Sequence, residues 1–292
     1  MWKEPMPELP EVESLVRTLR SGKPSLIGSR IRSVILVWPG VLSQHSDSAG
    51  LVQLEGCSFA SIGRLGKYLI FSLNCPGTQP HFLVIHLRMT GRLFLVPDCD
   101  AIERHTRLTL MLDHGLALRF DDPRKFGRVW LTDDPETVTG GMGPDALTVA
   151  PDEFAACLAR YRRQLKPLLL DQSFVAGIGN IYADESLFRA GLHPLTNSAD
   201  LLPDETRRLH AAIRSVLGEA VDAGGANIDG VFKAGSFIVN VYGREGAPCR
   251  ICGTPISKIR VGQRGTHFCE QCQKLRSIAG IARLTGTAIG AA

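Results

Sequence analysis

The chain has 292 residues, of which 44% are hydrophobic and 21% are charged, a globular composition long enough for two domains and a small appended module. Its net charge of +4 is modest, so basic residues must be concentrated in particular segments if they bind a polyanion. No apolar run reaches the length of a membrane span, and Glu4, Pro5 and Glu8 do not suit a secretory signal, so we expect a cytoplasmic protein.

The first 135 residues predict one helix followed by many short strands. Residues 8–20 form the helix, because Val12, Leu15, Val16 and Leu19 recur with helical spacing. Closely spaced apolar runs, broken by Gly, Pro and Asp, then predict a β-sandwich or barrel-like domain. The predicted strands are Ile31–Trp38, Tyr68–Leu73, Phe82–Leu87, Leu93–Val96, Leu108–Leu112, Leu116–Phe120 and Val129–Leu131, with a hairpin turn at residues 113–115.

The remaining chain has a helical pattern. Residues 135–144 contain three glycines and predict a linker. Helices are predicted over residues 152–163, 180–190 and 204–222, and Gly224 and Gly225 end the last one. We therefore expect an N-terminal catalytic domain (6–135), a linker (136–150), a helical domain (151–225), a metal-binding module (240–274) and a disordered tail (275–292).

Four cysteines near the C-terminus have the spacing of a zinc site, C-x2-C, then sixteen residues, then C-x2-C: Cys249, Cys252, Cys269 and Cys272. Four protein ligands close a tetrahedral site, so one structural zinc ion is expected. Two disulfides are the alternative. The lack of a signal peptide, and the single, scattered placement of the other cysteines (Cys57, Cys75, Cys99 and Cys157), indicate a reducing compartment and favour zinc. The basic residues around the site indicate a nucleic-acid contact.

Other segments combine cations with glycine or apolar residues. Residues 176–180 open a helix with two glycines, a pattern that can present backbone N–H groups to a phosphate. Residues 121–128 interleave cations with Phe126, and residues 86–92 place Met89 between arginines. Each is either a solvated turn with one core residue or a wedge that enters stacked bases. Lys67, at the start of an apolar strand, suits a solvated end, a phosphate contact or catalysis.

These segments, in this order, resemble formamidopyrimidine-DNA glycosylases from Met6 to Lys274. The resemblance implies an α+β fold, with a helix before an N-terminal β-sandwich domain, a helical domain with a helix–two-turn–helix, and a four-cysteine zinc finger. It implies damaged double-stranded DNA as the partner of a monomer in the bacterial cytosol and nucleoid, with no membrane and no small-molecule cofactor. The matching segments are Met6–Glu13, Gly66–Leu69, His86–Gly91, Asp122–Gly127, Leu168–Gln172, Ala176–Glu185, Val241–Gly246 and the zinc finger.

The resemblance also implies catalytic roles. Pro7 matches a nucleophile whose N-terminal amine attacks C1′ of the damaged nucleotide and forms an iminium, while Glu8 moves protons. Lys67 and Arg264 match proton donors for the β- and δ-elimination that cut the strand. For Arg264 we favour phosphate binding, because a guanidinium is a poor acid at neutral pH.

The DNA contacts follow from the same resemblance. Met89, Arg124 and Phe126 match the trio that fills the void when the damaged base is flipped out, and Arg124 pairs with the orphaned cytosine. The other expected DNA-binding residues are His86, His105, Arg162 and Asn180.

Two features depart from the family. Residues 1–6 precede Pro7, and an internal proline nitrogen is a tertiary amide that cannot attack carbon, so we expect translation to start at Met6 and Pro7 to be exposed afterwards. The stretch from Gly224 to Tyr242 is shorter than usual and lacks a Thr/Ser-rich start. Formamidopyrimidines or abasic sites are therefore expected to be better substrates than 8-oxoguanine.

The predicted activity is that of a base-excision-repair glycosylase and abasic-site lyase acting on oxidised purines. An endonuclease VIII-like enzyme for oxidised pyrimidines is one alternative, which Leu9, Met89, Arg124 and Phe126 disfavour. A non-catalytic protein that binds lesions or abasic sites is the other, if residues 1–6 are retained.

Overall fold

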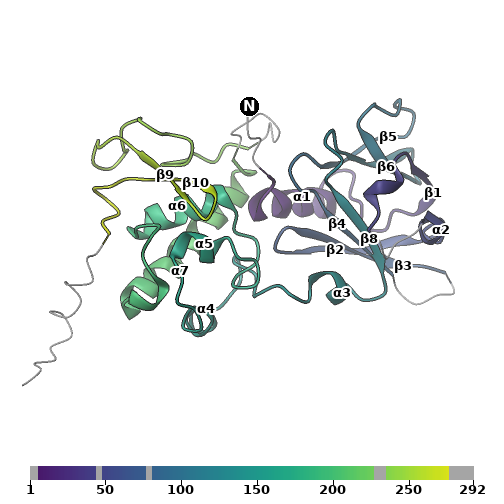
Figure 1. Ribbon diagram of the computed structural model, residues 1–292. Helices are drawn as coiled ribbons and strands as arrows, with labels where there is room; N and C mark the ends of the chain where they lie inside the picture. The colour runs from purple at the N-terminus through teal and green to yellow at the C-terminus, as the bar shows by residue number, and fades with distance from the viewer. Residues whose placement is uncertain (1–5, 44–47, 77–80, 227–234, 276–292) are drawn as a thin grey trace, which may run out of the picture. The chain divides into compact units, whose positions relative to one another are not determined.

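The computed structural model describes residues 6–43, 48–76, 81–226 and 235–275 (Figure 1). They form two compact units. The first contains the chain up to Thr148, Gln172–Gly179 and Leu217–Ile238, and the second contains Val149–Asp171, Asn180–Val216 and the chain from Val239. Within the described ranges, no helix combines the length and the apolar character that crossing a lipid bilayer requires.

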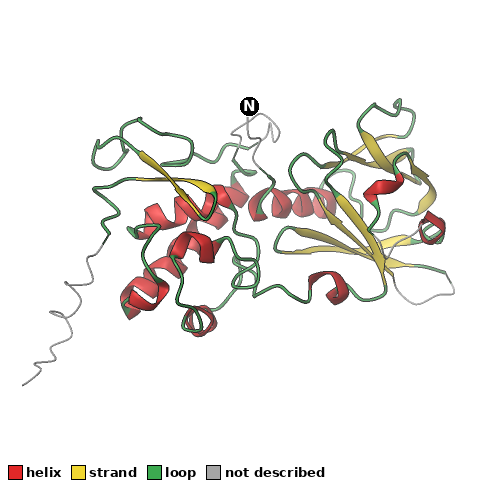
Figure 2. Cartoon of the chain, in the orientation of Figure 1, coloured by secondary structure: helices red, strands yellow, loops and turns green. Residues whose placement is uncertain are grey.

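The first unit contains helix α1 (Leu9–Ser21) and two four-stranded antiparallel sheets (Figure 2). One sheet has the order β1-β6-β7-β5 and the other β2-β3-β4-β8. Their bounds are β1 (Ile31–Leu36), β2 (Ser58–Leu65), β3 (Tyr68–Asn74), β4 (His81–His86), β5 (Arg92–Pro97), β6 (Thr106–Leu112), β7 (Leu116–Asp121) and β8 (Arg128–Thr132). Short helices η1 (Pro39–Val41), α2 (Ser48–Val52) and α3 (Glu136–Thr139) lie in the connections.

A single hydrophobic core lies between the two sheets and includes one face of α1. Val12 and Val16 of α1 belong to the same cluster as Phe71 of β3 and Leu110 of β6, and all four are at most 2% exposed. Because both sheets bury alternate residues in one cluster, the predicted β-sandwich is confirmed.

Strand β2 is absent from the predictions. Only Phe59 and Ile62 of its eight residues are buried, and small or polar residues fill much of the rest. Since β2 is an edge strand, its exposed positions carry little hydrophobic signal.

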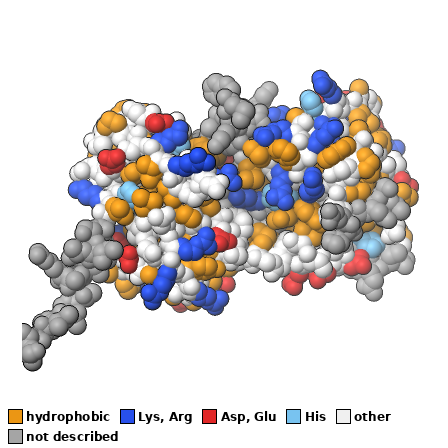
Figure 3. Space-filling view, in the orientation of Figure 1, with side chains coloured by type: hydrophobic (Ala, Val, Ile, Leu, Met, Phe, Trp, Pro, Cys, Tyr) orange, Lys and Arg blue, Asp and Glu red, His pale blue; other side chains and the backbone are white. Residues whose placement is uncertain are grey.

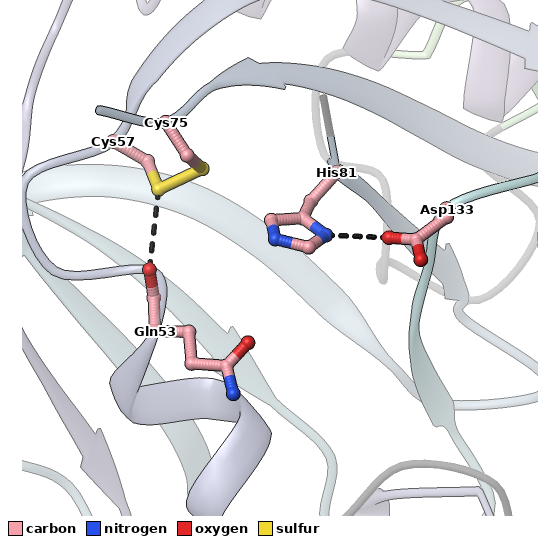
Figure 4. Close-up of a disulfide and its surroundings, with 5 residues drawn as sticks. All are labelled: Gln53, Cys57, Cys75, His81 and Asp133. Carbon is pink, nitrogen blue, oxygen red and sulfur yellow. Dashed lines mark hydrogen bonds and ion pairs between the residues drawn. A yellow bond between two sulfur atoms is a disulfide. The ribbon is translucent and has the colours of Figure 1, made fainter. Parts of the chain in front are cut away.

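Cys57 and Cys75 form a disulfide (Figure 4). The expectation that these cysteines stand singly is therefore wrong. They are 18 positions apart in sequence, but β2 and β3 pair with Ser58 opposite Asn74. This register brings together Cys57, just before Ser58, and Cys75, just after Asn74. The Cys57 carbonyl also accepts a hydrogen bond from Ile31 N of β1 at 2.8 Å, so the bridge lies where edge strands of the two sheets meet.

The second unit contains α4 (Pro151–Leu158), α5 (Leu165–Leu169), α6 (Asn180–Ala190), η2 (Ser198–Asp200) and most of α7 (Pro203–Asp222). The predicted helix over residues 152–163 ends at Leu158 instead. The following residues pair with another segment, because Ser198 N donates to Arg163 O at 2.8 Å and Gln164 bridges Asn197. These long-range hydrogen bonds replace those that a longer helix would make.

A hairpin of β9 (Ser257–Val261) and β10 (Arg264–Phe268) follows and separates the two cysteine pairs. Phe188 of α6 and Val241 pack against Cys249 and Cys269 in a small core. The predicted disordered tail (275–292) lies outside the described residues except for Leu275. Residues 227–234, the middle of the shortened stretch from Gly224 to Tyr242, also lie outside them.

Candidate active site and metal centre

Pro7 and Glu8 form the entry to α1. Glu8 N donates to Glu11 Oε2 at 2.9 Å, and Glu11 Oε1 accepts from Ala226 N at the same distance. Glu8 and Glu11 are each 3% exposed, and Pro7 is buried. The N-terminal turn of α1 is therefore held by a buried carboxylate, which fixes where Glu8 lies.

The glycine-rich loop of residues 176–179 lies directly against this turn. Leu9 N donates to Gly177 O at 3.2 Å. A Cβ atom at Gly179 would come within 2.2 Å of Glu8 Cδ, so only glycine allows the carboxyl group to approach this closely. Gln172 holds the loop in shape, because its Oε1 accepts from Gly177 N at 2.9 Å and its Nε2 donates to Ile178 O at 3.0 Å.

The β2–β3 turn, which carries Lys67, lies against the same loop through Gly66. Gly66 and Lys67 connect the paired residues Leu65 and Tyr68, and Lys67 is only 7% exposed. A Cβ atom at Gly66 would lie 3.1 Å from Ala176 Cβ. The α1 entry and the β2–β3 turn therefore both contact residues 176–179, so the turns that carry Glu8 and Lys67 meet at one loop.

An ion-pair network fixes the β2–β3 turn. Arg64 Nε contacts Glu13 Oε2 at 2.7 Å, and its two terminal nitrogens contact both oxygens of Asp145. Asp145 Oδ2 also accepts from Gly66 N at 3.0 Å. Because the Arg64 side chain is 5% exposed, this bidentate pair is rigid and shielded from solvent.

His86 ends β4 and is neutral at physiological pH. Burial, followed by the positive charges of Arg88 and Lys67, lowers its pKa to about 3. Its Nδ1 atom accepts from Arg88 N at 2.9 Å, and its ring packs edge-on against Tyr68. His86 is 6% exposed, so it shapes the turn that carries Met89.

Met89 and Phe126 line one pocket of about 360 Å³, together with Met6, Arg88 and Arg128. Phe126 is 44% exposed, and the guanidinium of Arg124 lies 4.7 Å from the centre of its ring. The structure therefore brings the three residues of the predicted void-filling trio to adjacent turns.

His105 is exposed beside these turns. His105 O accepts from Asp122 N at 2.9 Å, which places it beside the turn that carries Arg124 and Phe126. On the first unit, Figure 3 shows Lys and Arg side chains in the middle of the visible face, with acidic side chains nearer its lower and outer margins. This distribution suits an anionic ligand despite the modest net charge.

In the second unit, Asn180 and the Arg264 hairpin are adjacent. Asn180 begins α6, and its Nδ2 donates to Gly265 O at 3.1 Å, next to the exposed Arg264. Lys166 Nζ donates to Asn180 O at 2.9 Å and pairs with Asp184 at 2.6 Å. A helix N-terminus and an exposed arginine thus lie together, a combination that suits a phosphate.

Arg162 lies elsewhere in the second unit. It is exposed and lines a pocket of about 560 Å³ with Tyr161, Ser198 and His210. None of the other predicted binding residues lines that pocket.

The four cysteines of the predicted zinc site come together. Their sulfur atoms lie within 4.8 Å of one another, including separations of 3.4 Å for Cys252–Cys269 and 3.9 Å for Cys249–Cys272. A tetrahedron with Zn–S bonds of about 2.3 Å has sulfur–sulfur edges of roughly 3.8 Å, so the cluster fits one zinc ion. Burial raises the pKa of Cys269 and Cys272, and zinc supplies the positive charge that stabilises their thiolates.

Several supporting residues have no part in the sequence predictions. Glu11, Arg64 and Asp145 fix the turns around Pro7 and Lys67. Asp122 accepts hydrogen bonds from two turns at once. Glu11 and Asp122 lie inside the matching motifs, which is the signal by which sequence reasoning could have found them. The pairing of Arg64 with Asp145 has no local signature in the sequence.

Comparison with known families gives three consecutive matches. The formamidopyrimidine-DNA glycosylase N-terminal domain matches residues 6–129, the H2TH domain of the same enzymes matches residues 141–230, and a zinc finger found in FPG and IleRS matches residues 246–275.

Individual proteins cover nearly the whole chain. Formamidopyrimidine-DNA glycosylases of Enterococcus faecalis and Bacillus subtilis are both 40% identical, covering 93% and 92% of this chain and 98% and 99% of their own lengths. The Lactococcus lactis Fpg bound to DNA containing an abasic site has a TM-score of 0.83 at 33% identity, with 92% of this chain and all of that chain covered. MutM in complex with DNA containing carbocyclic 8-oxo-G gives the same values.

Proposed function

Because this chain belongs to the formamidopyrimidine-DNA glycosylase family, we propose that it removes oxidised purines from DNA through an iminium formed by Pro7 and then cuts the strand by β- and δ-elimination. The observation that carries the proposal is the convergence of the Pro7–Glu8 turn and the Lys67 turn on residues 176–179. The enzyme is a zinc-containing DNA glycosylase, and its working form is proposed to be a monomer.

The chemistry requires Pro7 as a free secondary amine. Its nitrogen attacks C1′ and gives up its proton, and the damaged base leaves with a proton. The nitrogen lone pair then breaks the C1′–O4′ bond, O4′ takes up a proton as the sugar ring opens, and the iminium is formed. An α-amino group has a pKa near ~8, so a useful fraction is neutral in the cytosol. Glu8, held beside the loop, supplies and removes protons at the sugar. Loss of a C2′ proton then expels the 3′ phosphate, and a second elimination expels the 5′ phosphate.

The other site residues hold the DNA. Lys67 is proposed to deliver a proton or bind phosphate, while Asn180, Arg264, His105 and Arg162 bind the backbone. Met89, Arg124 and Phe126 are proposed to occupy the space of the extruded nucleotide, with Arg124 donating to cytosine. His86 acts indirectly through the backbone of the Met89 turn.

A second candidate is a lesion-binding protein without catalysis. In the chain with residues 1–6 attached, the nitrogen of Pro7 is acylated by Met6, and Met6 lines the pocket of Met89 and Phe126. Such a chain keeps the DNA contacts but has no amine at this position.

Borohydride trapping separates the two candidates. A chain that begins at Pro7 should form a permanent crosslink to a duplex containing an oxidised guanine or an abasic site, because borohydride reduces the iminium. Pro7→Gly should retain part of the trapping, since glycine still offers an amine. Efficient trapping by the 292-residue chain, with Met1 confirmed by intact mass, would show that Pro7 is not the nucleophile.

The preferred lesion is a finer proposal. Solved relatives include a Lactococcus lactis FPG mutant with DNA containing Fapy-dG and MutM with DNA containing carbocyclic 8-oxo-G. We propose that formamidopyrimidines and abasic sites are the better substrates here. Strand-cleavage rates on matched duplexes test this order, and equal or faster cleavage at 8-oxoguanine would contradict it.

A further inference from the structure

Asp122 is a buried carboxylate that the proposed chemistry does not use. It is 1% exposed and follows the end of β7. Its Oδ1 accepts the Thr90 hydroxyl and also Arg124 N, the latter at 3.2 Å, and its Oδ2 accepts from Gly127 N at 2.7 Å. One carboxyl group therefore joins the turn that carries Met89 to the turn that carries Arg124 and Phe126.

The ring of Phe120 packs under both turns. A Cβ atom at Gly127 would lie 2.3 Å from this ring, and one at Gly91 would lie 2.9 Å from it. Phe120 itself is 1% exposed. Neither turn can shift toward the core without moving the ring, so the two turns share a support as well as a hydrogen-bond acceptor.

Both turns hold a non-glycine residue in the left-handed conformation. Arg88 has φ +57° and Lys125 has φ +61°, a region that costs energy for residues with a side chain. Lys125 N donates to Asp122 O at 3.3 Å, and its ammonium lies 5.4 Å from the centre of the Trp38 ring. The surrounding contacts therefore maintain the strained backbone that displays Arg124 and Phe126.

We propose that the Asp122–Thr90 pair is the positioning element that makes Met89, Arg124 and Phe126 act as one rigid unit, and that it sets the preference for cytosine opposite the lesion. The inference rests on the proposed role of this trio. Hydrogen bonds to a buried charged group are stronger than those between neutral groups, strong enough to decide whether the guanidinium of Arg124 is aligned with a base edge. An unsupported Arg124 would still bind DNA by charge but would distinguish bases poorly.

Binding measurements test this without relying on catalysis. Affinities are measured for duplexes with a tetrahydrofuran abasic analogue opposite cytosine or adenine, using the chain that begins at Pro7. Thr90→Val and Asp122→Asn should each reduce the cytosine preference by about tenfold, with similar affinity for the adenine duplex. The double variant should lose no more than the stronger single variant, because the two groups act as a pair.

Matched controls come from buried neighbours outside this contact. Thr109→Val removes a buried hydroxyl that has no hydrogen-bond partner, and Asp121→Asn alters the adjacent buried carboxylate, whose Oδ1 also has none. Both should retain the preference. Thr90→Ser, which keeps the hydroxyl, should retain the cytosine preference that Thr90→Val loses. Thermal unfolding verifies that each variant is folded.

The outcomes separate this inference from the proposed function. A wild-type preference that survives in folded Thr90→Val and Asp122→Asn overturns the inference, as does a wild-type protein with no preference. Equal losses on both duplexes would mean a general structural role and would also overturn it. Failure of borohydride trapping, with the cytosine preference lost in the variants as expected, rejects the Pro7 chemistry and leaves the positioning role standing.

Discussion

Glu8 lies at the start of α1, where its position depends on contacts far away in sequence. Glu11 fixes the backbone of Glu8, and Gly179 leaves room for its carboxyl group. The carboxyl group is thus placed before substrate arrives, which lowers the entropic cost of the proton transfers proposed for it.

Glu8→Gln should abolish base excision but leave some cleavage at a preformed abasic site. An amide cannot exchange protons at the sugar, yet no glycosidic bond remains to be broken at an abasic site. We expect a loss of at least about 100-fold in excision, typical of a missing general acid–base group. Single-turnover rates on the two substrates measure this, and equal losses on both would contradict the assignment.

His86 should make folding stability depend on pH. Its ordinary pKa is near 6.5 and its folded pKa is about 3, so the unfolded chain takes up a proton first as the pH falls. The full stability is present above about pH 6.5 and declines toward pH 3. At pH 5 the expected loss is roughly 2 kcal/mol.

The variant His86→Gln isolates this effect, because it can still accept from Arg88 N but does not titrate. Between pH 8 and pH 5, its free energy of unfolding should fall by roughly 2 kcal/mol less than that of wild type. His114→Gln is the control, since His114 is 83% exposed. Identical pH profiles of urea unfolding for wild type and His86→Gln would rule out a buried, neutral His86.

At the scale of elements, the β2–β3 hairpin is restrained at both ends. Its turn presents Lys67 and is held by Arg64 and Asp145, while its open end carries the Cys57–Cys75 disulfide (Figure 4). The disulfide lies at the end remote from Lys67 along the strands, so we expect it to contribute stability with little effect on chemistry.

Loss of the disulfide in Cys57→Ser should lower the free energy of unfolding by about 3 kcal/mol, the estimate for a loop of this size. Chemical unfolding provides the measurement, and Cys99→Ser, which alters an exposed free cysteine, should change nothing. Of the eight cysteines, six should be alkylated after denaturation and zinc removal without reductant. Alkylation of all eight would contradict the bridge.

The zinc hairpin supports Asn180 through Gly265, so metal removal should weaken DNA binding. Chelation or Cys272→Ser should reduce affinity by about tenfold or more, because the phosphate contacts of Asn180 and Arg264 lose their scaffold. Zinc content and DNA affinity are measured together. A metal-free preparation with undiminished binding would show that the zinc finger is not needed for these contacts.

At the scale of the whole molecule, charge placement matters more than total charge. Lys and Arg number 33 against 29 acidic residues, so a net +4 alone explains little affinity for DNA. The binding residues proposed in each compact unit nonetheless include cations, Lys67 and Arg124 in the first and Arg162 and Arg264 in the second, which predicts affinity that falls with salt.

Arg264→Ala should lower the slope of log affinity against log salt by about 0.9, the value for one phosphate contact on duplex DNA. Asn180→Ala should weaken binding with an unchanged slope, because its amide carries no charge and releases no counterion. Affinities between low and moderate salt measure both. An unchanged slope for Arg264→Ala would mean that this exposed arginine does not contact phosphate.

The sequence by itself determined the features that depend on local pattern or motif spacing. Helix α6 was predicted over its observed residues, and the zinc site followed from cysteine spacing, because both signals lie within a few dozen positions. The functional motifs identified the family, which the comparisons then confirmed.

Only the tertiary structure decided the contacts between distant segments. The disulfide needed the β2–β3 register, the early end of α4 needed the pairing of Gln164 with Asn197, and the placement of Glu8 needed Gly179 beside it. Asp122 likewise gains its role only when two turns share one carboxyl group. Such contacts arise from packing between residues far apart in the chain, and a local pattern carries no record of which distant residue will arrive.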